Sequence, residues 1–230
     1  MEVNEKWKEG VKQAWDENAP NWSAHSKNMW ETGSRKTILP FCEKYFKEQG
    51  EVLDIGCGNG YSTSLLQEKM FRPVGIDVSN EMIRFARKSY PELSFHQGDI
   101  QQLPYERASF DGVLMINVIE WTPSPKEVLY ELNRIMKRDG MMCAGILGPT
   151  AGPRKVSFNR LLGETAIMNT MMPWEFITLA EQNGFKAVDQ QIVPKNWDHN
   201  IRGELPLLAQ QALSFMTVVM LKKENDTEWT

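Results

Sequence analysis

The segment VLDIGCGNG, residues 52–60, constrains the fold of this 230-residue chain more than any other stretch. A short apolar run reads as a buried strand and leads into a turn with Gly56, Gly58 and Gly60, after which a helical pattern begins. Glycine permits positive φ angles and leaves space for a ligand beside the backbone, and the next helix presents free N–H groups at its first turn. A glycine kept only for packing would explain one such position better than three alternating ones. The segment therefore predicts a strand, a turn and a helix that hold a nucleotide-like ligand.

The same alternation of apolar strands and helices continues along the chain. Strands are expected at residues 51–55, 72–78, 93–100, 110–120, 141–147, 185–193 and 214–223, and helices at 61–70, 80–90, 124–140 and 174–185. Ser79 and Ser124 are the expected N-caps of the second and third of these helices, and Pro125 suits a first helical position. Strands that alternate with helices at this spacing predict an α/β fold with a parallel sheet.

The segments outside this alternation are expected to form a cap, an insertion and a tail of one domain, residues 1–230. Residues 1–50 read as a helical cap, in which tryptophans recur every seven or eight residues from Trp7 to Trp30. Pro20 is expected to interrupt that segment, and a second helix is expected over 34–47. Residues 51–147 form the core, 148–173 an insertion rich in Gly, Pro and Met, 174–223 the rest of the sheet, and 224–230 a frayed tail.

Composition narrows the classes of partner. The formal net charge of −4, without a dense Lys/Arg block, disfavours a nucleic-acid partner. Three separated cysteines predict neither a disulfide framework nor a metal site. The first residues are charged, which predicts no signal peptide, and the longest apolar runs are too short to cross a bilayer. The expectation is a reduced, cytoplasmic protein that acts away from membranes.

The glycine loop separates two classes of nucleotide-binding protein. A dinucleotide-binding dehydrogenase carries G-x-G-x-x-G, but here the third glycine comes one position early, at Gly60, and Tyr61 follows it. The pattern D-x-G-x-G-x-G, which begins at Asp54, resembles the first motif of class I S-adenosylmethionine-dependent methyltransferases. The resemblance implies S-adenosylmethionine as cofactor, S-adenosylhomocysteine as product, and a Rossmann-like sheet of seven mostly parallel strands with helices on both faces and an antiparallel last strand. A nicotinamide-dependent oxidoreductase is the weaker alternative.

Further motifs that resemble this family follow in order over residues 15–147. In GIDVS, the resemblance makes Asp77 the acceptor for both ribose hydroxyls, since a carboxylate offers two acceptor oxygens. In GDIQQLPY the resemblance implies that Asp99 accepts from the adenine amino group and that the N–H of Ile100 faces the adenine ring. In FDGVLMINVIEW the backbone of Asn117 holds the methionyl end. Other positions that the resemblance places around the cofactor are Cys57, Val78 and Met82.

The N-terminal cap narrows the resemblance to the small-molecule branch that includes ubiquinone- and biotin-pathway methyltransferases. WDENAPNW is similar to a signature of that branch and makes Trp22 an aromatic cover for the cofactor, while SRKT suggests Arg35 as the partner of the cofactor carboxylate. Many relatives carry a histidine at the position of Trp121. Whatever that histidine does in them cannot be assigned to this chain, and no catalytic residue is assigned. A non-catalytic cofactor-binding regulator remains an alternative.

The acceptor is expected to be a small molecule that is largely apolar or aromatic. Trp and Met residues occur in the cap, in the 148–173 insertion and, as Trp197, in residues 194–213, the three segments able to cover the carboxyl edge of the sheet as a mobile lid. The same residues would also suit plain packing of the lid onto the sheet, or a homodimer contact.

Overall fold

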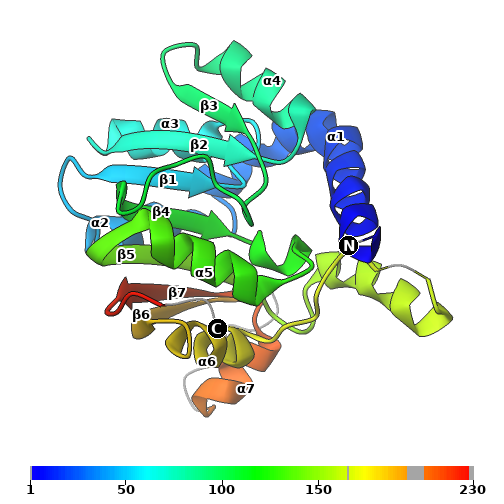
Figure 1. Ribbon diagram of the computed structural model, residues 1–230. Coiled ribbons are helices and arrows are strands. Elements are labelled where there is room, and N and C mark those ends of the chain that lie inside the picture. The colour runs from blue at the N-terminus through cyan, green and yellow to red at the C-terminus, as the bar shows by residue number, and fades with distance from the viewer. Residues whose placement is uncertain (1, 165, 196–204, 228–230) are drawn as a thin grey trace.

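The computed structural model describes residues 2–164, 166–195 and 205–227. It contains a seven-stranded sheet in the order β3-β2-β1-β4-β5-β7-β6, flanked by helices (Figure 1). Strands β1 to β5 pair in parallel, and β7 lies antiparallel between β5 and β6. This arrangement confirms the predicted fold class, including the antiparallel last strand.

The elements follow the expected alternation. The strands are β1 (Glu51–Ile55), β2 (Arg72–Asp77), β3 (Ser94–Gln97), β4 (Phe110–Ile116), β5 (Met136–Leu147), β6 (Phe185–Val193) and β7 (Met216–Lys223). The α-helices are α1 (Glu2–Glu31), α2 (Ile38–Glu43), α3 (Tyr61–Glu68), α4 (Asn80–Ser89), α5 (Pro125–Ile135), α6 (Pro173–Glu181) and α7 (Leu207–Leu213). The 3₁₀ segments are η1 (Ile119–Trp121) and η2 (Gly152–Leu162). The predicted N-caps are confirmed, because Ser79 and Ser124 accept from the backbone N–H of Met82 and Glu127.

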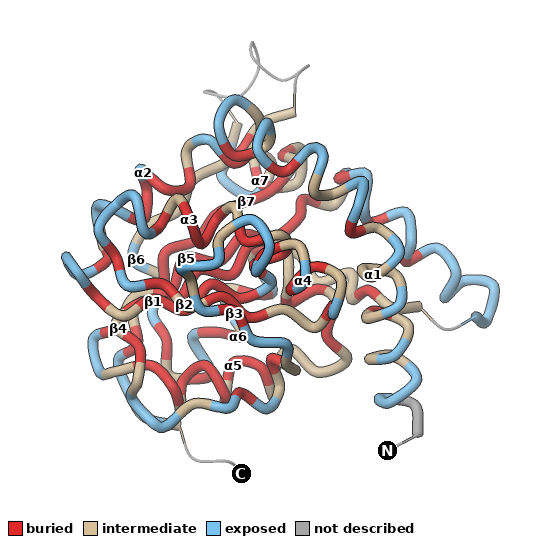
Figure 2. Tube along the Cα trace, turned by 90° about the horizontal axis from the view of Figure 1, so that it is seen from above, coloured by how far each residue is buried: buried red, intermediate tan, exposed pale blue. Residues whose placement is uncertain are grey.

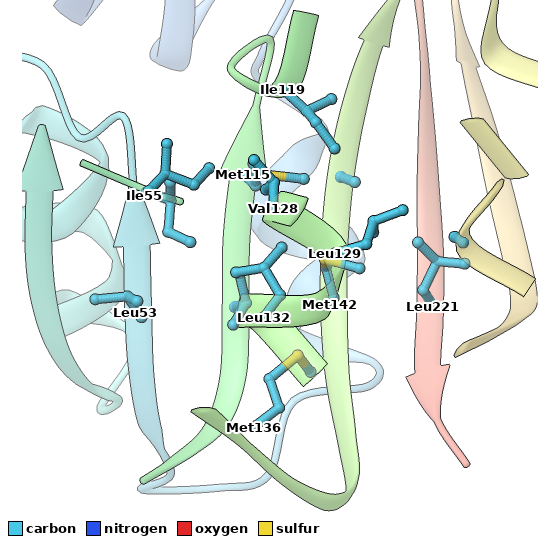
Figure 3. Close-up of a cluster of buried hydrophobic side chains, with 14 of the residues drawn as sticks. Leu53, Ile55, Met115, Ile119, Val128, Leu129, Leu132, Met136, Met142 and Leu221 are labelled. Atoms are coloured by element: carbon cyan, nitrogen blue, oxygen red, sulfur yellow. The ribbon is translucent and has the colours of Figure 1, made fainter. Parts of the chain in front are cut away.

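The sheet is buried on both faces, which explains its nearly continuous apolar strands. On β4, Val113 and Met115 face the α5 and α6 side, while Leu114 and Ile116 face α2 and α3. Figure 3 shows Val128, Leu129 and Leu132 of α5 directed onto the strands. Each such side chain contributes about 1.5–3 kcal/mol when fully buried. Burial follows the same layers in Figure 2, with buried strands inside and exposed residues on the outer helix faces.

Helix α1 is continuous, so the expectation that Pro20 interrupts the cap was wrong. Proline lacks an N–H and removes one helical hydrogen bond, but contacts on both sides of Pro20 hold the helix. Before it, the indole Nε1 of Trp7 donates to the carbonyl oxygen of Trp121 at 2.8 Å. After it, Trp30 is buried in the core. Tertiary contacts of the tryptophan stripe therefore outweigh the local cost of Pro20.

Helix α5 ends at Ile135, five residues before the predicted stop at Gly140, and β5 begins at once. The cause lies far along the chain. The ammonium of Lys223, which is 3% exposed, donates to the carbonyl oxygens of Asn133 at 2.7 Å and Met136 at 3.0 Å. These carbonyls at the end of the helix thus find a buried donor that no local pattern reveals.

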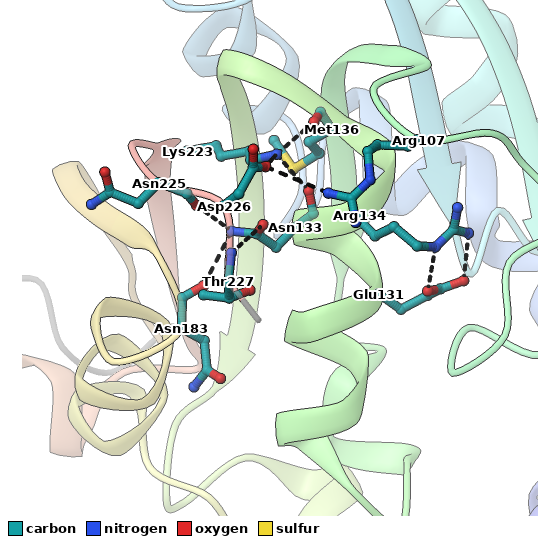
Figure 4. Close-up of polar contacts among 10 residues, drawn as sticks. All are labelled: Arg107, Glu131, Asn133, Arg134, Met136, Asn183, Lys223, Asn225, Asp226 and Thr227. Carbon is teal, nitrogen blue, oxygen red and sulfur yellow. Dashed lines mark hydrogen bonds and ion pairs between the residues drawn. The ribbon is translucent and has the colours of Figure 1, made fainter. Parts of the chain in front are cut away.

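The residues after Lys223 are tied to the same place, which corrects the prediction of a frayed tail as far as Thr227 (Figure 4). The side-chain amide of Asn133 donates to the carbonyl oxygen of Asn225 at 2.8 Å, and its oxygen accepts from the N–H of Thr227 at 3.2 Å. Lys223 also pairs with Asp226 at 2.7 Å. Residues 228–230 lie outside the described part.

Three smaller differences concern the other connecting segments. The second helix is shorter than expected, because residues 34–37 form turns before α2. The insertion contains the long 3₁₀ segment η2, and α7 precedes the last strand; the sequence predicted neither. Within the described residues, no helix is both long enough and apolar enough to cross a membrane.

Candidate functional site

A cavity of about 410 Å³ lies at the carboxyl ends of β1, β2, β4 and β5, between the sheet and α1. Figure 1 shows α1 running along the edge at which these parallel strands end. Ligands of open α/β sheets bind at this edge. Most of the predicted cofactor residues line the cavity: Trp22, Arg35, Gly56, Gly58, Asp77, Val78, Met82, Asp99, Ile100 and Asn117.

Three predicted residues, Asp54, Cys57 and Gly60, lie behind the wall rather than on it. Cys57 is buried against Ile83, Ala86 and Phe95. A Cβ on Gly60 would come within 2.7 Å of the Phe95 ring, so packing alone requires glycine there. The sequence pattern thus mixes residues that face a ligand with residues that support the loop.

The glycine loop is held tightly enough to exclude side chains. Gly58 has a φ of 53°, and a Cβ on it would lie 2.8 Å from the indole Nε1 of Trp22. Gly56 has a φ of 66°, and a Cβ there would lie 2.4 Å from Val118. Positive φ and close approach both require glycine at these positions. The bare backbone of the loop therefore forms part of the cavity wall.

Asp54 supports the loop from behind. Its carboxylate accepts from the hydroxyls of Ser62 and Thr63, both at 2.6 Å, and it is 2% exposed. Burial raises the pKa of Asp54 to about 6, against the lowering effect of these two hydroxyls. This carboxylate thus fixes the start of α3 relative to β1, and its role is to position the loop.

Asp77 ends β2 and faces the cavity. One carboxylate oxygen accepts from the N–H of Gly58 and the other from the N–H of Ser79, both at 2.9 Å. An ionised carboxylate has about four lone-pair sites, so each oxygen retains acceptor capacity toward the cavity. Burial raises the pKa of Asp77 to about 6, and the two backbone bonds oppose that rise.

Asp99 follows β3, on the loop where the adenine ring was expected. Its Oδ1 accepts from the N–H of Gln101 at 2.9 Å, which shapes the turn. Its Oδ2 lies 2.6 Å from the ammonium of Lys8 on α1. Both side chains are about one-third exposed, so this ion pair spans the mouth of the cavity. No pattern in the sequence connected Lys8 with this loop.

Arg35 places a buried cation in the cavity wall. Its guanidinium lies over the Trp22 ring, 4.7 Å from the centroid, and 5.5 Å from that of Trp30. Its Nη2 donates to the Asn117 side-chain oxygen at 3.4 Å. Burial lowers the pKa of Arg35 to about 10, partly offset by Asp54, so it stays charged at neutral pH.

Another part of the cavity wall is aromatic and apolar. Trp15 packs edge-to-face against Trp22 and Trp121, with ring centroids 5.4 and 5.3 Å apart. Leu147, Pro153 and Phe215 complete this wall. Of these residues only the tryptophans stood out in the sequence.

The wall formed by α1 could have been predicted if the helix had been taken as uninterrupted. The residues that then lie along one stripe of the helix and line the cavity are Lys8, Val11, Trp15, Trp22 and Met29.

The insertion is anchored beside this wall by polar contacts. Arg154 is 7% exposed and donates to the carbonyl oxygens of Leu147 and Met171. The carboxylate of Glu120, fully buried, accepts from the N–H of Leu147 at 2.7 Å. The carbonyl oxygen of Glu120 accepts from the backbone N–H of Asn169 at 2.6 Å. These bonds fix the carboxyl end of β5, while the prediction that the insertion moves as a lid stays a prediction. Residues 196–204 of the third expected lid segment, Trp197 among them, lie outside the described residues.

Comparisons with known proteins concern the family and the fold of the chain. Residues 53–144 match a family model described as a methyltransferase domain. A protein of Encephalitozoon cuniculi named as a methyltransferase is 30% identical over 156 residues, which cover 66% of this chain and 69% of that protein. The malonyl-[acyl-carrier protein] O-methyltransferase of Legionella pneumophila is 33% identical over 60% of this chain and 50% of its own length.

Similarity in structure extends further along the chain than similarity in sequence. A solved complex between the Haloferax volcanii Trm112 methyltransferase activator and a methyltransferase matches with a TM-score of 0.70 at 20% identity, over 92% of this chain and 98% of that one. At that identity the match concerns the fold alone. The first four curated relatives are matched over only 20% to 50% of their own length.

Proposed function

The chain belongs to the class I S-adenosylmethionine-dependent methyltransferases, and from this premise we propose that it methylates a small, largely apolar or aromatic molecule. One observation carries the proposal. The same cavity is lined by a polar group of residues, namely the glycine loop, Asp77, Asp99 and Arg35, and by an aromatic group around Trp15 and Trp121. The first suits a nucleoside with a charged amino-acid tail, and the second suits an apolar acceptor.

The residues present fit the cofactor of this family. Gly56 and Gly58 line the cavity with bare backbone, so a ligand can lie against the loop. Asp77 would accept from two ribose hydroxyls with its remaining lone pairs, and Asp99 from the adenine amino group. Arg35 would pair with the cofactor carboxylate through its planar, charged group. Asn117, which bonds to Arg35, lies beside that position.

The bound cofactor supplies a methyl group on a positively charged sulfur, ready for attack by a nucleophile. The chain's own part is to position the acceptor in line and to exclude water. Trp15, Trp22 and Trp121 supply a large apolar surface for both tasks. The curated names of relatives include methyltransferases of trans-aconitate and of demethylmenaquinone, which supports a small-molecule acceptor.

The test uses S-adenosylmethionine with a deuterated methyl group, incubated with the protein and an extract separated into small-molecule, protein and nucleic-acid fractions. Mass spectrometry should find the label in an apolar or aromatic small molecule, and Asp77→Ala should abolish the transfer. Label confined to the protein or nucleic-acid fraction would contradict the proposed acceptor class. Binding of the cofactor without transfer to any fraction would instead support a non-catalytic regulator.

The raised pKa of Asp77 predicts that cofactor binding depends on pH. Asp77 must be ionised to accept from both ribose hydroxyls, and it protonates as the pH falls through about 6. We therefore expect the affinity for S-adenosylhomocysteine to fall about tenfold between roughly pH 7 and pH 5, since one pKa unit corresponds to a factor of ten. Calorimetry across this range measures the effect.

The matched control is Asp77→Asn, which cannot titrate at this position and keeps Asp54 unchanged. Its affinity should be weaker at neutral pH but nearly constant across the same range. A pH dependence of equal size in the variant would assign the titration to another group, such as Asp54, whose pKa is also about 6.

A further inference from the structure

The first half of α1 is fastened across the cavity at three points. Trp7 donates to the carbonyl oxygen of Trp121 at 2.8 Å, and the ammonium of Lys8 lies 2.6 Å from Asp99. Further along the helix, Asp16 accepts from the hydroxyl of Ser79 at 2.6 Å. These contacts reach the loops after β4, β3 and β2, so this half of the helix bridges the whole mouth.

The second half of α1 is held differently. Pro20 has no N–H, so the hydrogen-bond ladder lacks the bond from residue 20 to the carbonyl of Asp16. Beyond it, Trp30 is buried in the core and Trp22 packs against Arg35. Val11 in the first half and Trp30 in the second are both buried, but the polar contacts with the loops after β2, β3 and β4 lie in the first half, and Pro20 weakens the joint between the halves.

Lys8 and the adenine ring meet at the same carboxylate. Asp99 Oδ1 already accepts from the N–H of Gln101, and Oδ2 faces Lys8. In the proposed cofactor site the adenine amino group donates to this same side chain. Each carboxylate oxygen has two lone-pair sites, so Asp99 can accept from both donors, but the ammonium 2.6 Å from Oδ2 offsets its charge and weakens its hydrogen bond to the adenine amino group.

We propose that Lys8 is an unassigned residue of the cofactor site, whose ammonium shares Asp99 with the adenine amino group and weakens that contact. This inference rests on the proposed function. It makes Lys8 a residue that opposes cofactor binding while holding the first half of α1 across the mouth. The ammonium beside Asp99 lies near position 6 of the purine in this arrangement, so it would favour a ligand that carries an acceptor oxygen there.

The test uses S-adenosylhomocysteine, with an amino donor at position 6 of the purine, and S-inosylhomocysteine, with an oxygen acceptor there and a hydrogen on N1. Each ligand is compared between variant and wild type, so the change at N1 is common to both proteins. Lys8→Met should bind the adenosyl ligand up to about fivefold more tightly than the wild type, the range expected for removing an exposed ion pair. The same variant should bind the inosyl ligand at least about twofold more weakly, because it loses a donor to the oxygen. Calorimetry measures both affinities.

Lys27→Met is the matched control. It makes the same change on the same helix at an exposed position beyond Pro20, where Lys27 lies 3.8 Å from Glu31, and it should leave both affinities unchanged. In an Asp99→Asn background, Lys8→Met should no longer tighten the adenosyl ligand, since the charge pair is already absent. Added salt should narrow the difference between Lys8→Met and the wild type.

The outcomes separate this inference from the proposed function. Wild-type protein that binds S-adenosylhomocysteine while Lys8→Met binds it equally or more weakly contradicts the role of Lys8 alone. Wild-type protein that does not bind S-adenosylhomocysteine contradicts the proposed function and this inference together. Opposite changes for the two ligands, confined to the Lys8 variant, support the sharing of Asp99.

Discussion

Asp77→Ala is expected to weaken S-adenosylhomocysteine binding by about 150-fold or more. The substitution removes the acceptor for two hydroxyl donors, and hydrogen bonds to a charged group contribute about 1.5–3 kcal/mol each. It also removes the acceptor for the N–H groups of Gly58 and Ser79, which shape the edge of the cavity. Calorimetry with wild-type and variant protein measures the loss of affinity.

Little loss of thermal stability should accompany this change. The raised pKa of Asp77 shows that burial opposes its charge, so removing the carboxylate relieves that cost while two backbone bonds are lost. Asp99→Ala is the comparison variant, and its loss of affinity should be smaller because only one amino contact disappears. If Asp77→Ala keeps the wild-type affinity, with the fold intact by circular dichroism, then Asp77 is not part of the cofactor site.

Arg35→Met is expected to weaken S-adenosylhomocysteine binding by about 10- to 100-fold, because a charged hydrogen-bonded pair with the ligand carboxylate is lost. The methionine side chain retains packing against Trp22 and Trp30. The sharper measurement uses 5′-methylthioadenosine, which has the nucleoside but no carboxylate. Its affinity should differ by less than about twofold between variant and wild type, since the lost pair is worth about 1.5–3 kcal/mol only when a carboxylate is present.

Arg35→Lys separates charge from shape at this position. Lysine keeps the charge but not the planar group that lies over Trp22, so an intermediate loss is expected. If Arg35→Met weakens the affinity for both ligands equally, then Arg35 supports the fold of the pocket and does not bind the carboxylate. A full wild-type affinity in both variants would place the carboxylate elsewhere.

The parts that the sequence predicted well depend on local chemistry. The three glycines have the positive φ angles expected of them, and Asp77 stands at the end of the strand after the loop. The family resemblance built on these motifs is confirmed by the comparisons. A turn that needs glycine, or a carboxylate at the end of a strand, leaves a signal within a few residues. Such signals can be read without knowing the rest of the fold.

The parts that the sequence did not predict depend on residues far apart in the chain. Pro20 suggested a break, but contacts such as Trp7 with Trp121 keep α1 continuous. The end of α5 depends on Lys223, which lies far later in the chain. Lys8 joins the site only because the continuous helix carries it to Asp99. In each case the tertiary partner decides between local alternatives that are close in free energy.

The place of β7 in the sheet has a consequence for synthesis on the ribosome. This strand follows β6 in the chain but lies between β5 and β6. Until it has emerged, β5 offers an unpaired edge that carries Met142, Ala144 and Ile146. Unpaired apolar edges promote aggregation during folding. A nascent chain therefore cannot form this sheet by adding strands in the order in which they are synthesised. The exposed edge of β5 needs protection by a chaperone most between the synthesis of β5 and that of β7.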